Sequence, residues 1–122
     1  MKVAATAKNN LLDSEIDPRF GRCSYFLIID TETMEFDTIS NESAMSRGGA
    51  GIQAAQTVAK TGVDAVITGN IGPNAYQTLS AAGIKVFTGA NGIIKDAIEK
   101  YKKGELKQTQ SPNVGSHSGM GR

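Results

Sequence analysis

The chain has 122 residues, of which 39% are hydrophobic and 20% are charged, and its formal net charge is +1. This length allows one compact domain with a hydrophobic core, and the composition is that of an ordinary globular protein. The small net charge, together with the lack of a dense basic stripe, argues against nucleic-acid binding. We expect a single domain over residues 1–107.

The sequence contains no segment typical of a signal peptide or a membrane span. The apolar run in residues 1–7 is short and interrupted, and no later run reaches the length needed to cross a bilayer. Cys23 has no second cysteine with which to form an internal disulfide, which agrees with a reducing compartment. We therefore expect a cytoplasmic protein with no membrane partner.

Hydrophobic patterning predicts three strands in the first part of the chain. Residues 2–7 form a short apolar run, and residues 24–30 form a longer one that suits a strand buried on both faces. Residues 35–41 alternate polar and apolar side chains, as an edge strand does. The polar segment 8–23 between the first two strands is a long loop for so small a domain, and such loops are often functional.

The second part of the chain alternates helices with short strands. Apolar residues recur at helical spacing in residues 50–61, 73–82 and 93–103, and a glycine follows each of these segments. Apolar strands over residues 63–67 and 84–87 separate the helices. Because the links between helices and strands are short, this order predicts parallel crossovers and a three-layer α/β/α domain.

Four loops are predicted to meet at one edge of the sheet. If the first three strands form an antiparallel meander, residues 8–23, 42–50, 68–73 and 88–92 share the edge where open α/β sheets bind ligands. The last two of these loops are glycine-rich turns that open helices. Helix N-termini carry unpaired N–H donors and a partial positive charge, so we expect an anion or an anionic cluster there.

The candidate binding residues come from these loops and from the start of the first helix. They are Arg19, Phe20, Gly21, Arg22, Cys23, Arg47, Gly48, Gly49, Gly51, Gly69, Asn70, Gly72, Gly89 and Asn91. A guanidinium at this edge can hold a phosphate or a sulfide-rich cluster, or it can form a surface salt bridge with a neighbour such as Asp17. The glycines, in turn, can simply permit tight turns between strands and helices.

Cys23 and His117 are the candidate metal ligands. A Cys23 thiolate near two arginines would have a lowered pKa and would bind soft metals well, although a lone buried cysteine is more often inert. His117 and Met120 belong to a polar, Gly/Ser-rich tail, residues 108–122, which we expect to be flexible. One cysteine and one histidine cannot complete a four-ligand zinc site, so a metal would bring ligands such as bridging sulfides or be shared between chains.

Catalytic constellations are missing from the predicted domain. It contains no histidine, hence no Ser/His/Asp or Cys/His pair, and no pair of carboxylates stands at the strand ends. Neither glycine turn matches G-x-G-x-x-G, and no P-loop lysine follows. We therefore expect a binding protein and not an enzyme. A regulator that binds a phosphate ligand or a nucleotide is the alternative, and a nuclease is the least favoured function.

Three sequence motifs resemble a known family. They are RFGRC at residues 19–23 before the second strand, GAGIQAA at residues 49–55, and DAVITGNIGPNA at residues 64–75. These motifs are similar to those of the dinitrogenase iron-molybdenum cofactor biosynthesis family, also called the nitrogenase accessory factor family. The resemblance extends from residue 1 to about residue 106. It implies a ribonuclease-H-like motif with three helices and a mixed five-stranded sheet, in the order 3-2-1-4-5 with strand 2 antiparallel.

The resemblance also implies a function, which is to bind or carry a metal–sulfur cluster or its precursor. Relatives include nitrogenase cofactor carriers and a branch that holds a molybdenum–copper sulfide cluster. The expected cargo is thus an iron–sulfur, iron–molybdenum–sulfur or molybdenum–copper–sulfur cluster, with cluster donor and acceptor proteins as partners. Arg19 departs from the family pattern, because many relatives have a histidine at this position.

Overall fold

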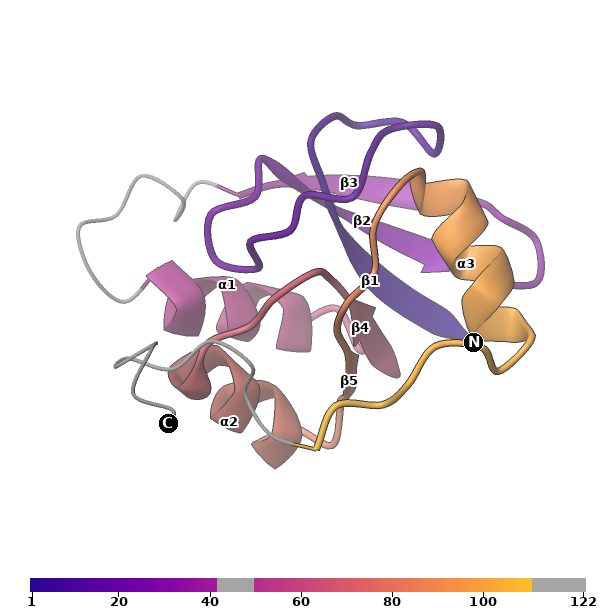
Figure 1. Ribbon diagram of the computed structural model, residues 1–122. Helices are drawn as coiled ribbons and strands as arrows, with labels where there is room; N and C mark the ends of the chain where they lie inside the picture. Colours follow the sequence, from indigo (N-terminus) through magenta and orange to yellow (C-terminus); the bar gives the residue numbers. More distant parts are fainter. Residues whose placement is uncertain (42–49, 111–122) are drawn as a thin grey trace.

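The computed structural model describes residues 1–41 and 50–110. Its elements in chain order are β1 (Lys2–Ala7), β2 (Tyr25–Asp30), β3 (Phe36–Ser40), α1 (Ala50–Ala59), β4 (Ala65–Ile67), α2 (Pro73–Ala81), β5 (Lys85–Phe87) and α3 (Ile94–Lys102) (Figure 1). This is the order that the sequence predicts. The bounds differ by a few residues, mainly because β4 and β5 are each three residues long.

The strands form one five-stranded mixed sheet in the order β3-β2-β1-β4-β5. Strand β2 is antiparallel to both of its neighbours, whereas β1, β4 and β5 are mutually parallel. The predicted topology is therefore confirmed. Ala7 at the end of β1 pairs with Tyr25 at the start of β2, so the loops that leave β1, β4 and β5 and the loop that enters β2 share one edge. We call it the C-terminal edge.

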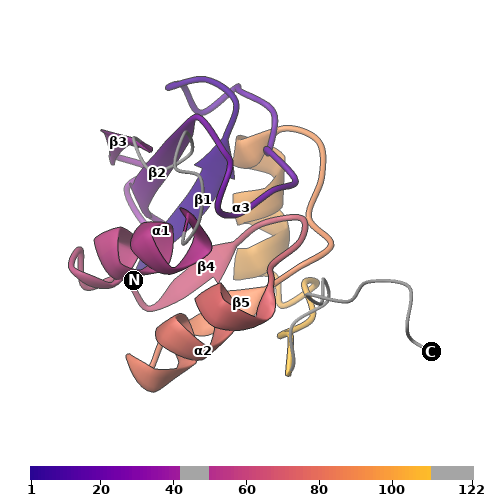
Figure 2. The ribbon, with the colours of Figure 1, turned by 90° about the vertical axis from the view of Figure 1, so that its left-hand side faces the viewer.

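Helices cover both faces of the sheet and make three layers. Figure 2 shows α1 and α2 on one face and α3 on the other. Successive side chains of a strand point to opposite faces, and the core is divided accordingly. Ala4 packs with Val58 of α1 and Leu79 of α2, while its neighbour Val3 packs with Ile98 of α3. The apolar stripes that predict the helices are thus the surfaces that they bury.

The chain after α3 returns to the open edge of β5. Gln108 forms an antiparallel bridge with Phe87, and the Thr109 N–H donates to the carbonyl oxygen of Val86 at 2.7 Å. The Tyr76 hydroxyl on α2 also donates to the Thr109 carbonyl oxygen, at 3.3 Å. Gln108 and Thr109 are the first two residues of the tail that the sequence predicts. They extend the sheet instead, because an open strand edge offers backbone partners whatever the side chains are.

The remainder of the predicted tail, including His117 and Met120, lies outside the described residues. Within residues 1–41 and 50–110, no helix is long and apolar enough to cross a membrane.

Candidate functional site

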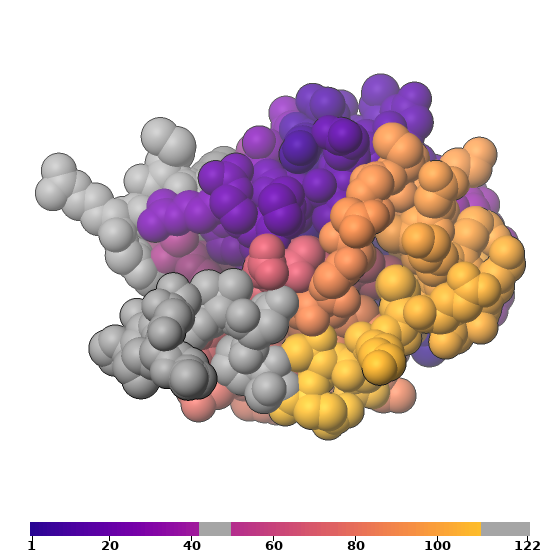
Figure 3. Space-filling model, in the orientation of Figure 1, coloured from indigo at the N-terminus to yellow at the C-terminus, as the bar shows by residue number. Residues whose placement is uncertain are grey.

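The loop before β2 is attached to the turn after β4. The Asn70 N–H donates to the Pro18 carbonyl oxygen at 2.7 Å, and the Phe20 N–H donates to the Asn70 carbonyl oxygen at 3.3 Å. The approach is so close that a Cβ on Gly69 would stand 2.6 Å from the Pro18 Cα, which only glycine avoids. In the space-filling view, the purple β1–β2 loop accordingly lies against the pink segment after β4 (Figure 3).

The same loop touches the first turn of α1. A Cβ on Gly21 would stand 3.0 Å from the Gly51 Cα, so the two backbones are in direct contact. On its other side, Gly51 faces α2, where a Cβ on Gly51 would meet the Ala75 Cβ at 3.5 Å. The Phe-Gly-Arg loop and the first turns of α1 and α2 therefore meet at one point of the C-terminal edge.

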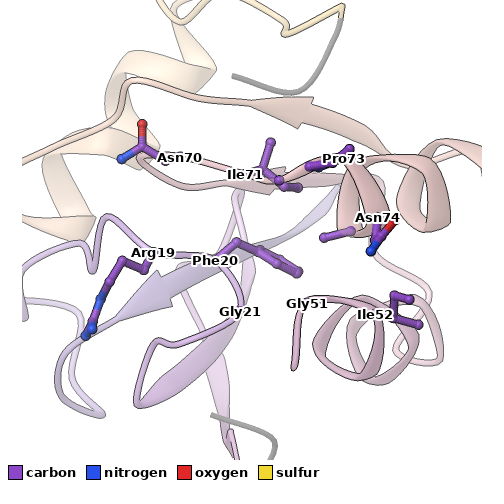
Figure 4. Close-up of a pocket in the computed structure, with 11 residues that line it drawn as sticks. Arg19, Phe20, Gly21, Gly51, Ile52, Asn70, Ile71, Pro73 and Asn74 are labelled. Carbon is purple, nitrogen blue, oxygen red and sulfur yellow. The ribbon is translucent and has the colours of Figure 1, made fainter. Parts of the chain in front are cut away.

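A cavity of about 360 Å³ opens between these three segments (Figure 4). Its lining residues are Arg19, Phe20, Gly21, Gly51, Ile52, Asn70, Ile71, Gly72, Pro73, Asn74 and Ala75. Most of these side chains are apolar. The first turns of α1 and α2 also point their N-terminal ends here, and the first-turn N–H groups of a helix have no acceptor within it. The cavity thus combines apolar walls with the positive ends of two helices.

The structure brings together six of the residues that the sequence singles out. Arg19, Phe20, Gly21, Gly51, Asn70 and Gly72 all line the cavity. Sequence analysis missed the other five, Ile52, Ile71, Pro73, Asn74 and Ala75. The predicted helix start at Pro73 could have indicated three of these five, because Pro73, Asn74 and Ala75 form the first turn of a helix that begins at the binding edge.

Other predicted site residues do not line the cavity. Gly69 and Gly89 are instead bonded to each other, since the Gly89 N–H donates to the Gly69 carbonyl oxygen at 2.8 Å. Arg22 and Asn91 are exposed at the same edge of the sheet. Arg47, Gly48, Gly49 and His117 fall outside the described residues, so their placement stays a prediction.

The Arg19 guanidinium is engaged with Asp17. Its Nε lies 3.3 Å from the Asp17 Oδ1, in a pair where the arginine side chain is 65% exposed and the carboxylate only 4%. Figure 4 shows the Arg19 side chain directed away from Phe20 and Ile52. Of the two interpretations that the sequence allows for this arginine, the salt bridge to Asp17 is the one that forms.

Cys23 corrects one prediction. Its side chain is fully buried, its Sγ donates to the Phe20 carbonyl oxygen at 3.3 Å, and the Asn41 side-chain amide donates to the Sγ at 3.7 Å. Burial, with a smaller contribution from the charge of Asp17, raises the pKa of the Cys23 thiol to about 12. The lowered pKa that neighbouring arginines would give is therefore wrong, because desolvation of the thiolate dominates. The other interpretation that the sequence leaves open, an inert buried cysteine, agrees with this burial. In this conformation Cys23 packs as a neutral thiol.

Metal-ligating side chains do not gather anywhere in the described part of the chain. No group of three or more His, Cys, Asp or Glu residues is placed to hold a metal ion there. The polar groups that line the cavity at the first turns of α1 and α2 are backbone N–H groups and the side-chain amide of Asn74, which lies beside Ile52 in Figure 4. This is a donor set for an anion, and it could hold a metal only if the metal arrives with its own ligands.

Comparison with solved structures identifies close relatives of this fold. The apo form of the orange protein from Desulfovibrio gigas superimposes with a TM-score of 0.89 at 39% identity, over 92% of this chain and 95% of that chain. A NifB-like protein of Thermotoga, solved by NMR, gives a TM-score of 0.76 at 34% identity, over 88% of this chain and 91% of that chain.

Sequence comparisons agree with the structural ones. An uncharacterised protein of Methanocaldococcus jannaschii is 34% identical over 111 residues, which cover 88% of this chain and 91% of that protein. The family model described as dinitrogenase iron-molybdenum cofactor matches residues 1–104. The chain belongs to the dinitrogenase iron-molybdenum cofactor family, as the motifs around the Phe-Gly-Arg loop and the Gly-Pro-Asn-Ala turn indicate.

Proposed function

We propose that this protein binds and carries an anionic metal–sulfur cluster or its precursor and that it is not an enzyme. The observation that carries the proposal is the convergence of two helix N-termini, α1 and α2, on an apolar cavity at the C-terminal edge. The positive ends of helices attract negative charge, and apolar walls suit a polarisable ligand better than a strongly hydrated one. A metal–sulfur cluster is both negatively charged and polarisable.

The chemistry of the cavity fits a cluster that brings its own sulfides. Protein N–H groups donate hydrogen bonds to cluster sulfurs and thereby tune and hold the cluster. The first turns around Gly51 and Asn74 supply such donors, while the described residues offer no set of side chains that could build a metal centre from free ions. The volume of about 360 Å³ lies within the range of small-ligand sites.

Family membership supports the same cargo, since the family description names the iron-molybdenum cofactor. An iron–sulfur, iron–molybdenum–sulfur or molybdenum–copper–sulfur cluster is accordingly the proposed ligand, with cluster donor and acceptor proteins as partners. His117 and Met120 are proposed as additional soft ligands from the tail, because the cavity itself has neither imidazole nor sulfur among its lining side chains.

Anaerobic reconstitution tests the proposal. The purified chain is incubated with ferrous iron and sulfide, or with tetrathiomolybdate and cuprous ion, and is then desalted for metal analysis and visible absorption spectroscopy. We expect a coloured protein with a fixed ratio of metal to chain. A colourless, metal-free product under every condition would contradict the proposal, and specific thermal stabilisation by a nucleotide would instead support the alternative regulator.

A matched pair of variants locates the site. Ile52→Glu places a negative charge in the first turn of α1 at the cavity wall, where the helix N-terminus tolerates it but an anionic ligand is repelled. Gln56→Glu places a negative charge on an exposed position one turn later in the same helix. Cluster uptake should be lost in Ile52→Glu and retained in Gln56→Glu. Equal uptake by both variants would show that the cluster binds elsewhere.

A further inference from the structure

Asp17 is a buried carboxylate at the base of the Phe-Gly-Arg loop. Its main chain is fixed to β1, because the Asp17 N–H donates to the Thr6 carbonyl oxygen at 3.0 Å and the Thr6 hydroxyl donates to the Asp17 carbonyl oxygen at 2.7 Å. The residue is only 3% exposed. A carboxylate held in such a place requires hydrogen-bond donors, since an unpaired buried charge is costly.

Arg19 provides those donors with both its backbone and its side chain. The Arg19 N–H donates to the Asp17 Oδ1 at 3.0 Å, the Nε donates to the same oxygen at 3.3 Å, and the Nη2 donates to Oδ2 at 3.5 Å. Moving the guanidinium toward the cavity would remove the cationic partner of Asp17. The pair therefore keeps the guanidinium outside the cavity whose wall Arg19 forms, as Figure 4 shows.

Because the Arg19 guanidinium pairs with Asp17 and not with a ligand, the kind of anion that the cavity can bind is affected. A guanidinium is the usual partner of compact oxyanions such as phosphate, because its paired N–H groups offset the large cost of removing their water. Backbone N–H groups in the first turns of α1 and α2 offset less of that cost. A sulfide-rich anion spreads its charge over a larger, softer surface and gains from packing against the same apolar walls.

We propose that Asp17 is a specificity-determining residue, which holds Arg19 away from the cavity and thereby favours sulfide-rich anions over compact oxyanions. This inference rests on the proposed function, because it concerns the ligand class of the same site. It adds that Arg19, although it lines the cavity, does not neutralise the ligand. Asp17 acts through Arg19 and is a positioning residue in this sense.

The first test is Asp17→Asn, measured by calorimetric titration with molybdate and with tetrathiomolybdate at several salt concentrations. The amide oxygen that this substitution introduces can still accept the Arg19 N–H, but it no longer holds the guanidinium by charge. We expect molybdate to bind about tenfold tighter than to the wild type, as one charge-assisted hydrogen bond would give, and with a steeper dependence on salt. The gain should disappear in Asp17→Asn/Arg19→Gln. A variant without this gain, or a gain that survives in the double variant, overturns the inference.

Arg19→Gln alone provides a second test that does not depend on altering the buried residue. The side chain at position 19 is exposed and the backbone N–H of this residue still donates to the Asp17 Oδ1, so the variant should fold, with lower stability because Asp17 loses its cationic partner. Its affinity for tetrathiomolybdate should change by much less than the roughly tenfold loss that removal of a contacting guanidinium would cause. A large loss of tetrathiomolybdate affinity would mean that the guanidinium contacts the ligand and would overturn the inference. If wild-type protein takes up no thiometallate at all, the proposed function fails, whereas the molybdate titrations still decide the role of Asp17.

Discussion

Gly21 and Gly51 touch backbone to backbone, with only 3.0 Å available between a Cβ on Gly21 and the Gly51 Cα. The atoms on the far side of this contact belong to a helix and cannot rotate away as a flexible side chain would. The contact joins the Phe-Gly-Arg loop to the first turn of α1, and both residues line the cavity.

Gly21→Ala should therefore disturb both stability and binding. The added methyl group must displace either the loop or the start of α1, which should lower the free energy of unfolding by about 1–3 kcal/mol. Urea denaturation measures this change, and cluster uptake should fall with it. Gly51→Ala is the matched control, because its Cβ would meet the Ala75 Cβ at an ordinary 3.5 Å and alanine favours a helix by about 1 kcal/mol. Equal destabilisation by both variants would contradict the argument.

Thr6→Val should loosen the loop from the sheet. The buried Thr6 hydroxyl donates to the Asp17 carbonyl oxygen at 2.7 Å and lies 2.8 Å from the Thr68 hydroxyl. Valine keeps the shape but leaves the carbonyl oxygen without this donor, so we expect a loss of about 1–3 kcal/mol in unfolding free energy. Thr68→Val retains the bond from Thr6 to Asp17 and should cost less. The reverse order of the two variants in thermal denaturation would rule out this account.

The buried thiol of Cys23 should make stability fall at alkaline pH. Its pKa is raised in the folded protein from 9.0 to about 12, so above pH 9 the unfolded chain loses this proton while the native chain retains it. The thiol's contribution to stability is thus fully present below pH 9 and is lost as the pH rises towards 12. Ionisation of this group should decrease the unfolding free energy by at most about 1.4 kcal/mol per pH unit.

Cys23→Ala isolates that slope from other titrating groups. Denaturant unfolding is measured at pH values from neutral up to about 12. Over this range the unfolding free energy should decrease less for the variant than for the wild type. The native wild-type thiol should also react slowly with a thiol reagent at neutral pH and rapidly once unfolded. Fast alkylation of the folded protein would instead indicate an accessible thiolate and would contradict this account.

Two truncations separate the two roles proposed for the end of the chain. Removing residues 107–122 deletes the hydrogen bonds of Thr109 to Val86, Thr88 and Tyr76, and should lower the unfolding free energy by about 1–4 kcal/mol. Removing residues 111–122 leaves these bonds in place and should therefore lower the unfolding free energy by less than the longer truncation does. It also removes His117 and Met120, so retained cluster binding in the shorter truncation would exclude both as required ligands.

The sequence predicts the architecture because its signals are local. Periodic apolar residues and the glycines that end each helix establish the order of elements and favour parallel crossovers. The family resemblance implies the strand order within the sheet, and the structure has that order. The meeting of loops at the C-terminal edge follows from strand directions alone. The motifs at residues 19–23 and 64–75 add the family, which the comparisons confirm.

The chemistry within the site depends on contacts that sequence patterns do not reveal. Arg19 faces Asp17, which is two residues away, and no composition or spacing distinguishes this from an arginine that faces a ligand. Cys23 is fully buried, and desolvation raises the pKa of its thiol although the hydrogen bond from Asn41 acts in the opposite direction. The sequence does not show which of these effects dominates. Thr109 joins the sheet through its backbone, which leaves no hydrophobic signal in the sequence.

The position of β1 between β2 and β4 has a consequence for the stage of folding at which the cavity forms. Among the strands, β1 comes first in the chain, but it can pair with β4 only after Ala65, the partner of Val3, has been synthesised. The first turn of α2 comes later in the chain than β4. Such distant pairings form slowly, because the intervening chain must be closed into a loop. The cavity between the Phe-Gly-Arg loop and the first turns of α1 and α2 is therefore completed late in folding, after β4 and α2 have joined the sheet.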